Sequence, residues 1–241
     1  MAVSTIAAAG RRYLPRGYSD FARQLGIWFG FAAVYQVARG FADRDPAKAF
    51  ANGLRVIDFE RNANSLYELT LQRLADQSHA LATIASWTYW NSEFTVVGLT
   101  LLWVYLRRHE HFLRFRNTLL VANVIGLIGY VLLPTAPPRM FPDFGFGGVP
   151  HHDGLVQLAA NPYAAFPSLH AADALIVGVM LAIICRRWWA KVFWAIWPLW
   201  VWFAVMATGN HFWVDVAGGV VVALIAFGIM SRSRLSAVLA R

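Results

Sequence analysis

His211 and Asp215 are four residues apart, so they would share one face if the segment were helical. In that arrangement the carboxylate can accept the Nδ1 proton of the imidazole and leave Nε2 free to act as a nucleophile. The same pair would equally serve as a satisfied polar contact that joins two helices. These two residues alone therefore allow both a catalytic and a structural interpretation.

Further candidates stand in two other short motifs. His170 ends the run Phe166-Pro167-Ser168-Leu169-His170, in which Ser168 suits the N-cap of a following helix. The backbone N–H groups at such a helix N-terminus favour an anion. Arg139 follows two prolines and is the only Lys or Arg between residues 135 and 166, so it is the expected charge partner of that anion. His170 alone would more often be structural, but the combination predicts a phosphate pocket.

The elements that must position these residues are membrane helices. Hydrophobic residues make up 58% of the 241 residues and charged residues 14%, whereas a soluble domain usually has about 25% charged residues. A membrane-spanning helix needs about 20 mostly apolar residues. Six stretches qualify, at residues 21–41, 84–106, 117–134, 167–185, 192–207 and 211–230. We therefore expect an all-α integral membrane protein with six transmembrane helices, folded as a single membrane domain over residues 1–241.

The distribution of charge predicts the orientation of these spans. With a cytoplasmic N-terminus, the inner segments hold fourteen basic and two acidic residues, and the outer segments hold seven basic and eleven acidic residues. This asymmetry favours two cytoplasmic termini in the plasma (inner) membrane and puts the three motifs on the extracytoplasmic side. A nucleic-acid partner is not expected, because no basic patch with interleaved stacking aromatic residues remains.

Two outer segments are long enough to contribute to a site. Residues 46–80 carry apolar residues at helical spacing with charges between them, which predicts one or two amphipathic helices on or over the bundle. Residues 135–166 are rich in Pro, Gly, Phe and His without periodicity, which indicates an irregular, ordered active-site loop. His151-His152-Asp153 in this loop suggests a metal site, but no further ligand stands at recognisable spacing. We expect a solvated loop there, and neither a metal nor another cofactor.

The three outer motifs resemble those of the type 2 phosphatidic acid phosphatase superfamily. Its members carry a basic motif ending in Arg-Pro, a Pro-Ser-Gly-His motif and a Ser-Arg-x5-His-x3-Asp motif on a six-helix membrane core. Here the second motif reads Pro167-Ser168-Leu169-His170, and the third keeps His211 and Asp215. The resemblance covers residues 134–219 and implies an enzyme that acts on lipid phosphates.

The resemblance also implies a mechanism for these residues. His211 would attack phosphorus and form a phosphohistidine, while Asp215 holds its tautomer. His170 would protonate the leaving oxygen and then deprotonate the incoming water or alcohol. Arg139, Ser168 and the N-terminus of the fourth span would stabilise the phosphate oxygens. Asn210 is a further candidate for binding the phosphate.

This chain departs from the superfamily pattern at its cationic positions. The Lys of the first motif falls near Leu132, the Gly of the second on Leu169, and the Ser-Arg of the third on Ala204-Val205. Two of three cationic phosphate-binding residues are therefore replaced. The lost contacts would have to come from other polar residues, and the sequence does not choose among Asn210, Tyr163, His151 and His152.

The other residues of the motifs resemble the inositol phosphorylceramide synthase branch, whose members transfer a phosphorylated headgroup between lipids. The resemblance rests on the Phe-Pro-Ser-Leu-His run, the Pro-Pro-Arg element and the acidic stretch Asp58-Phe59-Glu60. We therefore expect a lipid phosphate substrate and leave hydrolysis and transfer to an alcohol or lipid acceptor both open.

Two rival functions fit parts of the same pattern. A proton-coupled transporter would use the ionisable residues as a relay, but they gather at one membrane face and the inner half of the spans holds none. A vanadium haloperoxidase would need at least as much positive charge as a phosphatase, and the missing cations weaken it. The relay of the transporter would consist of Glu93, His170, Asp173, His211 and Asp215.

Two of these acidic residues have further alternatives. Glu93 is expected to pair with Arg139 or with another arginine of the outer segments, unless it is an interfacial residue near the headgroups. Asp173 stands three residues after His170, so it either orients that imidazole or caps the helix, with a slight preference for the cap.

Overall fold

The computed structural model describes residues 14–42, 45–147 and 163–239, and within these the regular elements are helices. One isolated β-bridge joins Thr135 to Ala164. The helices, in chain order, are α2 (Gly17–Ala42), α3 (Pro46–Asn62), α4 (Tyr67–Asp76), α5 (His79–Asn91), the π-helical turn η1 (Ser92–Val96), α6 (Val97–Arg107), α7 (His109–Leu132), the 3-10 turns η2 (Pro138–Met140) and η3 (Pro142–Phe144), α9 (Leu169–Ile184), α10 (Trp188–Ala207) and α11 (Trp213–Leu239).

Three of the described helices are long and apolar enough to cross a membrane. They are α7, α10 and the part of α11 that ends at Arg232. Helix α9 is also apolar but has only 16 residues. The all-helical architecture is thus confirmed, whereas the full set of six spans stays a prediction.

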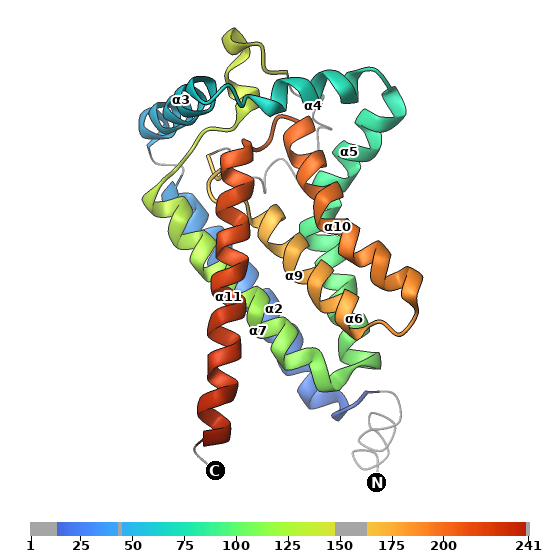
Figure 1. Cartoon of the computed structure of the whole chain (residues 1–241). Helices are drawn as coiled ribbons and strands as arrows, with labels where there is room; N and C mark the ends of the chain where they lie inside the picture. Colours follow the sequence, from blue (N-terminus) through green and yellow to red (C-terminus); the bar gives the residue numbers. More distant parts are fainter. Residues whose placement is uncertain (1–13, 43–44, 148–162, 240–241) are drawn as a thin grey trace.

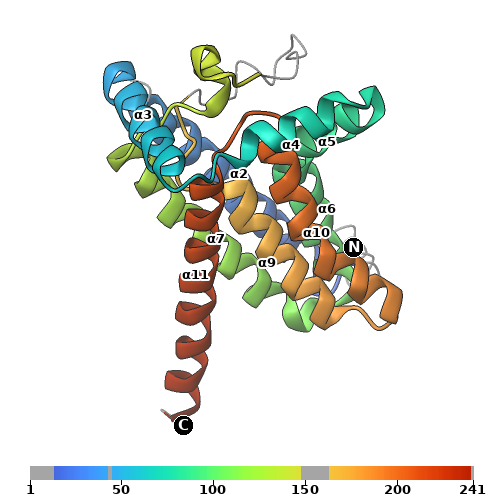
Figure 2. The same ribbon diagram turned by 45° about the horizontal axis from the view of Figure 1, so that its top comes forward.

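Helices α3 and α4 cross one end of the bundle of long helices (Figures 1 and 2). The first turn of α2 and the last turns of α11 lie at the opposite end (Figure 1). At the end covered by α3 and α4, the chain passes from α7 to α9 and from α10 to α11. The segments that carry the three sequence motifs are therefore close to one another.

The stretch at residues 84–106, expected as one span, is built from three pieces. Helix α5 passes into η1 at Ser92, and α6 begins at Val97. A π-helical turn inserts an extra residue into the helical repeat and changes the direction in which nearby side chains point. Glu93 is the second residue of this turn.

Helix α9 packs against α7, α10 and α11, so it forms the centre of the bundle. Close approach depends on glycines of the neighbouring helices. A Cβ atom at Gly219 of α11 would clash with the carbonyl oxygen of Ser168, and one at Gly126 of α7 would clash with the side chain of Leu169. Small residues at helix contacts are typical of membrane bundles. They bring α7 and α11 directly against the beginning of α9.

Helix α3 anchors the loop that follows α7. The side chain of Asn52 donates to the carbonyl of Pro134 at 2.8 Å, and the N–H of Ala136 donates to the carbonyl of Ala49 at 3.0 Å. A small apolar cluster fills the space between α3, this loop and the start of α11, and its buried members are Ile57, Ala136, Phe141, Phe146 and Phe212. This packing holds residues 135–147 in a defined path, and residues 148–162 of the predicted active-site loop lie outside the described residues.

Candidate active site

The sequence-predicted residues meet under α3 and α4. His170 lies in the first turn of α9, and the ring centroids of His170 and His211 are 5.6 Å apart. Arg139 lies in the turn η2, and its backbone N–H donates to the carbonyl of Gly209 at 2.9 Å. Gly209 itself has φ +69°, and a Cβ there would meet the carbonyl oxygen of Gly147, so glycine is required at this turn.

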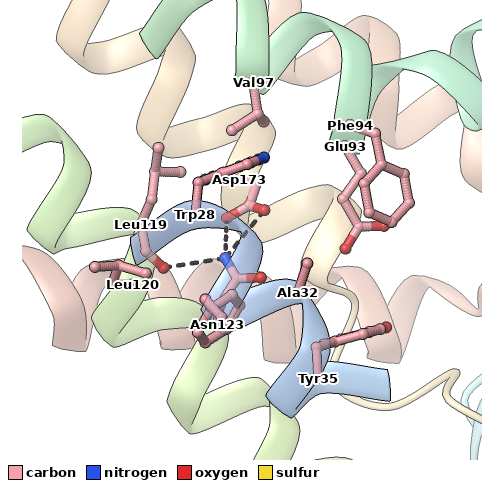
Figure 3. A pocket seen from close by; sticks show the side chains of 11 residues that line it. Trp28, Ala32, Tyr35, Glu93, Phe94, Val97, Leu119, Leu120, Asn123 and Asp173 are labelled. Carbon is pink, nitrogen blue, oxygen red and sulfur yellow. Dashed lines mark hydrogen bonds between the residues drawn. The ribbon is translucent and has the colours of Figure 1, made fainter. Parts of the chain in front are cut away.

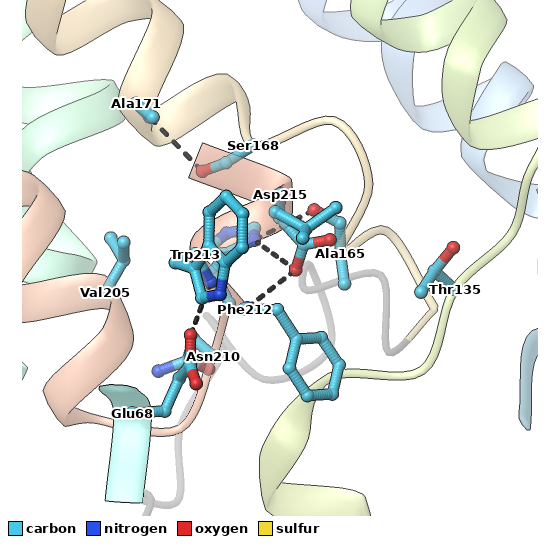
Figure 4. Close-up of polar contacts among 12 residues, drawn as sticks. Glu68, Thr135, Ala165, Ser168, Ala171, Val205, Asn210, Phe212, Trp213 and Asp215 are labelled. Atoms are coloured by element: carbon cyan, nitrogen blue, oxygen red, sulfur yellow. Dashed lines mark hydrogen bonds and ion pairs between the residues drawn. The ribbon is translucent and has the colours of Figure 1, made fainter. Parts of the chain in front are cut away.

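His211 is buried and stands in the short connection between α10 and α11. Its Nδ1 lies 2.9 Å from the carbonyl oxygen of Ala165, which belongs to the segment before α9 (Figure 4). A carbonyl oxygen can only accept a hydrogen bond, so this contact requires a proton on Nδ1. The neutral imidazole then carries its lone pair on Nε2.

Asp215 contacts His211 less directly than the four-residue spacing predicted. Its Oδ2 lies 3.6 Å from Nδ1 of His211, beyond hydrogen-bond distance, and accepts the backbone N–H of Phe212 at 2.8 Å. The reason is that α11 begins only at Trp213, so His211 precedes the helix. The carbonyl of Ala165 therefore takes the hydrogen bond that was expected to reach Asp215.

Two buried glutamates complete the beginning of α11. Glu68 of α4 accepts the backbone N–H of Trp213 at 2.5 Å, and Glu60 of α3 accepts that of Val214 at 3.3 Å (Figure 4 shows Glu68). Because Asp215 accepts the N–H of Phe212, three successive backbone N–H groups each have a carboxyl acceptor. The first N–H groups of a helix have no partner within it, and the positive end of the helix dipole favours acidic groups there.

Glu60 and Glu68 were not predicted as site residues, because charges in the segment 46–80 were expected between apolar positions of amphipathic helices. Both side chains are instead fully buried, while Leu54 and Leu74 are 41% and 47% exposed. A signal was present in the sequence around the start of α11. Phe212 cannot cap the helix with its side chain, so acceptors for these N–H groups had to come from elsewhere.

The two glutamates are close enough to perturb each other. Burial, and then the charge of Glu68, raises the pKa of Glu60 to about 9. Burial likewise raises the pKa of Glu68. The second oxygen of each carboxyl group, Oε2, has no donor among the described residues. A proton shared between the two groups would satisfy both oxygens, so the pair is held with fewer than two negative charges at neutral pH.

Ser168 acts as the N-cap that the sequence predicted for α9. Its side chain accepts the backbone N–H of Ala171 at 3.2 Å, and its own N–H donates to the carbonyl of Asp215 at 3.0 Å. Ser168 is fully buried. These bonds fix the start of α9 against α11 and thereby set the separation of His170 and His211.

Glu93 is the partner of His170, and not of Arg139 as the sequence suggested. Its Oε2 lies 3.2 Å from Nε2 of His170, and both side chains are largely buried. The ring of His170 also stacks on Tyr89, with centroids 4.5 Å apart. An imidazole nitrogen and a carboxylate oxygen at this distance attract each other when a proton lies between them. The turn η1 brings Glu93 to this place.

A cavity of about 100 Å³ lies within the bundle on the side of Glu93. It is enclosed by α2, η1, α6, α7 and α9 (Figure 3). Phe94 lines it and is 58% exposed, so the cavity reaches the outer surface of the bundle. Its wall is mostly apolar, and none of the described residues that line it is Lys or Arg. A neutral group is therefore favoured in this cavity over a phosphate.

Arg139 and Asn210, both predicted to hold phosphate, contact each other. The guanidinium donates to Oδ1 of Asn210 at 2.6 Å, and the amide of Asn210 donates to Oγ1 of Thr208 at 2.8 Å. Burial lowers the pKa of Arg139 from its ordinary value. Its charge acts on both His211 and Tyr89. The positive group is therefore close to His211 and to Tyr89, on which the ring of His170 stacks.

The other polar candidates lie elsewhere. Tyr163 packs against Phe50, with ring centroids 6.2 Å apart, at the edge of the apolar cluster under α3. Asp173 neither caps α9 nor contacts His170, since both of its oxygens accept from Nδ2 of Asn123, at 2.8 and 3.1 Å (Figure 3). His151, His152 and Asp153 lie outside the described residues.

The positions that correspond to the superfamily's missing Lys and Arg carry no polar side chain in this protein. Leu132 is 62% exposed, and Ala204 and Val205 are buried against α9 and its neighbours. Within residues 14–42, 45–147 and 163–239, no group of three or more His, Cys, Asp or Glu side chains could hold a metal ion.

Comparison with known proteins gives one matching family and one curated relative. The family model of the PAP2 superfamily matches residues 54–229, which include all three motifs. The phosphoinositol dihydroceramide synthase of Bacteroides thetaiotaomicron is 30% identical over 139 residues, a match that covers 49% of this chain and 45% of that protein. The match thus spans less than half the length of this curated relative. No solved structure is significantly similar to the chain. Because the family model matches most of its length, the chain belongs to the PAP2 superfamily.

Proposed function

We propose that this protein is a metal-independent lipid phosphotransferase or phosphatase that works through a phosphohistidine on His211. The observation that carries the proposal is the contact between Nδ1 of His211 and the carbonyl of Ala165. This contact leaves the lone pair on Nε2, the nitrogen that must attack phosphorus. A buried histidine with a purely structural role would not need a neighbouring arginine and a second histidine at 5.6 Å.

In the first half-reaction, Nε2 of His211 attacks phosphorus and forms a P–N bond. The P–O bond to the leaving alcohol breaks, and its electron pair passes to the departing oxygen. This oxygen takes a proton from the pair formed by His170 and Glu93. The products are a phosphohistidine and a free alcohol.

In the second half-reaction, water or another alcohol approaches from the same side. Its proton passes to the pair of His170 and Glu93 while its oxygen bonds to phosphorus. The P–N bond breaks, and its electron pair returns to Nε2 of His211. Water gives hydrolysis, and an alcohol gives transfer. The cavity beside Glu93 is the route by which a neutral acceptor would arrive.

The charge on phosphorus oxygens must be stabilised with one cation rather than three. The guanidinium of Arg139 provides it, and the amide of Asn210 holds the guanidinium in place. The backbone N–H groups at the start of α9, capped by Ser168, add partial positive charge. At the start of α11 the first N–H groups are already occupied by carboxyl oxygens, so that helix end offers less to an anion.

The site lies at the end of the bundle that α3 and α4 cover, opposite the first turn of α2. With the basic residues gathered toward the other end, we propose six spans with cytoplasmic termini and an extracytoplasmic active site in the inner membrane. The lipid substrate would then be taken from the outer leaflet. The name of the matched relative favours transfer of a phosphorylated headgroup to a lipid acceptor over simple hydrolysis.

The proposal is tested by incubating the purified protein with radiolabelled phosphatidic acid and phosphatidylinositol. Release of labelled product and formation of an acid-labile, base-stable protein phosphate are followed. We expect His211→Ala to lose both signals, with turnover reduced by about 10⁴-fold or more. Addition of a lipid alcohol shows whether it is consumed in place of water.

The exposed His79 offers a matched control for this experiment. His79→Ala removes the same side chain at the start of α5 and should retain full turnover. Full activity of His211→Ala, or a phosphoenzyme that persists in it, would show that another residue is the nucleophile.

A further inference from the structure

A second cavity, of about 280 Å³, lies between α2, α6 and α7. Its wall includes Phe21 near the start of α2 and Tyr105 near the end of α6. The start of α2 lies at the end of the bundle opposite α3 and α4 (Figure 1). None of the residues that the sequence predicted for the active site lines this cavity. It is therefore distinct from the active site, although Trp28 and Leu120 line both this cavity and the one beside Glu93.

The cavity opens sideways, toward the surroundings of the bundle. Three of its apolar wall residues are also exposed on the outside: Leu25 by 41%, Phe29 by 66% and Leu102 by 41%. In a membrane, such exposed apolar side chains on long helices contact acyl chains. A lipid molecule can therefore reach the cavity directly from the bilayer.

One wall residue, Arg116, carries a charge within the apolar helix α7. Its Nε and one of its Nη atoms donate to Oδ1 of Asn117, at 3.0 and 2.6 Å. The other Nη atom donates to the side-chain oxygen of Gln24. Both acceptors are neutral amides. Because a guanidinium has five N–H groups, two of them stay available to a further acceptor.

The neighbouring carboxylate is engaged with other groups. Asp20 accepts from the hydroxyl of Tyr105 at 3.0 Å and from the amide of Gln24 at 3.2 Å, and it pairs with Arg23 at 3.4 Å. Among the described residues, no carboxylate lies within ion-pair distance of Arg116. Asp20 attracts Arg116 and Arg23 repels it at longer range, so the guanidinium has no direct carboxylate partner and a phosphate in contact with it would be stabilised.

The position of Arg116 along α7 matches the level of lipid headgroups. It is the eighth residue of a helix that begins at His109, which places it about 10 Å along the axis. The side chain can extend toward the nearer membrane surface while the apolar wall stays at acyl-chain depth. Basic pockets between membrane helices are typical binding sites for anionic headgroups.

We propose that this cavity binds an anionic phospholipid of the leaflet opposite the active site. The phosphate of the lipid accepts the two available N–H groups of Arg116, and the beginning of an acyl chain lies against Phe29 and Leu102. With the orientation proposed above, this is the cytoplasmic leaflet. A zwitterionic lipid brings an ammonium group that cancels the charge attraction, so it binds more weakly.

The bound lipid would act on the same helices that carry the active site. Helix α6 continues from the turn η1 that positions Glu93, and α7 contacts α9. Filling the cavity therefore fixes the relative positions of α2, α6 and α7. This role is independent of the phosphotransfer reaction, and binding is expected also in His211→Ala.

The first experiment measures lipid binding directly by native mass spectrometry of the full chain in detergent. Phosphatidylglycerol and phosphatidylcholine with the same acyl chains are titrated against the wild type, Arg116→Gln and Arg114→Gln. We expect phosphatidylglycerol binding by Arg116→Gln to be weaker than that of the wild type by about fivefold or more. Arg114→Gln is the matched control, because Arg114 is an exposed arginine of the same helix that does not line the cavity.

A second pair of variants tests the cavity without removing the charge. Gly98 lines the cavity, and a Cβ there would meet nothing within 4 Å, so the side chain of Gly98→Leu starts in open space beside the cavity. Gly26→Leu is the control, since Gly26 has equally open surroundings and does not line the cavity. We expect Gly98→Leu to lose phosphatidylglycerol binding and Gly26→Leu to keep it.

A third measurement needs no variant and so does not depend on the folding of any. A phosphatidylglycerol with a photoactivatable group on its acyl chain is irradiated with the wild type in vesicles. We expect crosslinks at residues 21–29 and 98–105. Crosslinks confined to helices other than α2, α6 and α7 would overturn the proposal. Equal retention of the two lipids by the wild type, or unchanged binding in both Arg116→Gln and Gly98→Leu, would overturn it as well. Absence of phosphotransfer would contradict the proposed function and leave these binding results unaffected.

Discussion

The two histidines of the site are the same residue type in contrasting surroundings. Nδ1 of His211 faces a backbone carbonyl, which has no proton to exchange. Nε2 of His170 faces the carboxyl group of Glu93, which can share one. Their rings are only 5.6 Å apart. The difference shows that the neighbouring group decides the role of each imidazole. A neighbour that cannot exchange a proton suits the nucleophile His211, and a neighbour that can exchange one suits the acid and base His170.

The acidic residues divide in the same way. On the side of His211, Glu60, Glu68 and Asp215 each accept a backbone N–H at the start of α11. Their role there is to hold the helix end. On the side of His170, Glu93 contacts the imidazole and lines the neighbouring cavity. We infer that the first group is structural and that the second takes part in proton transfer.

Removal of His170 should give the largest difference between the His170 side and the His211 side of the site. His170→Ala should slow turnover of a lipid phosphate by about 10²–10⁴-fold, because a lipid alkoxide leaves poorly without a proton. With p-nitrophenyl phosphate, whose leaving group needs no proton, the phosphohistidine should still form. We expect a burst of nitrophenolate followed by negligible turnover, measured by stopped-flow absorbance. Absence of the burst would assign His170 to nucleophile formation and erase the contrast.

Glu93→Gln tests whether the carboxyl group of Glu93 shares the proton of His170. The amide keeps the size of the side chain but cannot exchange a proton. Loss of a close contact between an imidazole and a charged carboxyl group, worth about 1.5–3 kcal/mol, corresponds to a decrease of about 10- to 100-fold in kcat. The pH dependence of kcat should change shape, while KM should change little. Glu110→Gln, at an exposed side chain, is the control. An unchanged pH profile would show that Glu93 only packs against the ring.

The contrast between the two sides also explains what could be predicted from the sequence. His170, His211 and Asp215 were predicted as catalytic residues from their types and spacing together with the resemblance to the superfamily, and the structure brings their side chains together. The partners that distinguish the two histidines could not be predicted. One is the backbone carbonyl of Ala165, which carries no side-chain signal. The other is Glu93, which reaches His170 through a π-helical turn with no marker in the sequence.

The fold was predictable to a similar degree. Long apolar stretches predicted the helices because a membrane requires satisfied backbone hydrogen bonds over about 20 residues. Glu60 and Glu68 were missed because their burial depends on α11, more than 140 residues further along the chain. A charged residue in an outer segment normally faces water. Glu60 and Glu68 are buried instead because the backbone N–H groups at the start of α11 need acceptors.

Glu60→Gln gives the smallest expected effect on activity and tests the structural side of the contrast. Because the pKa of Glu60 is raised to about 9, above its value in the unfolded chain, its stabilising contribution is present at low pH and lost as the pH rises through about 9. Loss of the proton breaks the sharing with Glu68 and puts two carboxylates side by side. The amide that replaces the carboxyl group in Glu60→Gln stays neutral and can still accept the N–H of Val214.

The thermal midpoint of the purified wild type should therefore fall between about pH 7 and about pH 10, and that of Glu60→Gln should fall less. The difference in stability at the alkaline end should be about 1–3 kcal/mol, the usual cost of a buried polar group without its partner. Glu110→Gln again serves as the control, because its exposed carboxyl group should leave the wild-type pH dependence intact. Turnover at neutral pH should change less than in Glu93→Gln, since Glu60 holds the helix end and no reacting atom. Equal losses of turnover in the two variants would mean that the acids behind His211 also move protons, and the division between a structural and a proton-transferring side would fail.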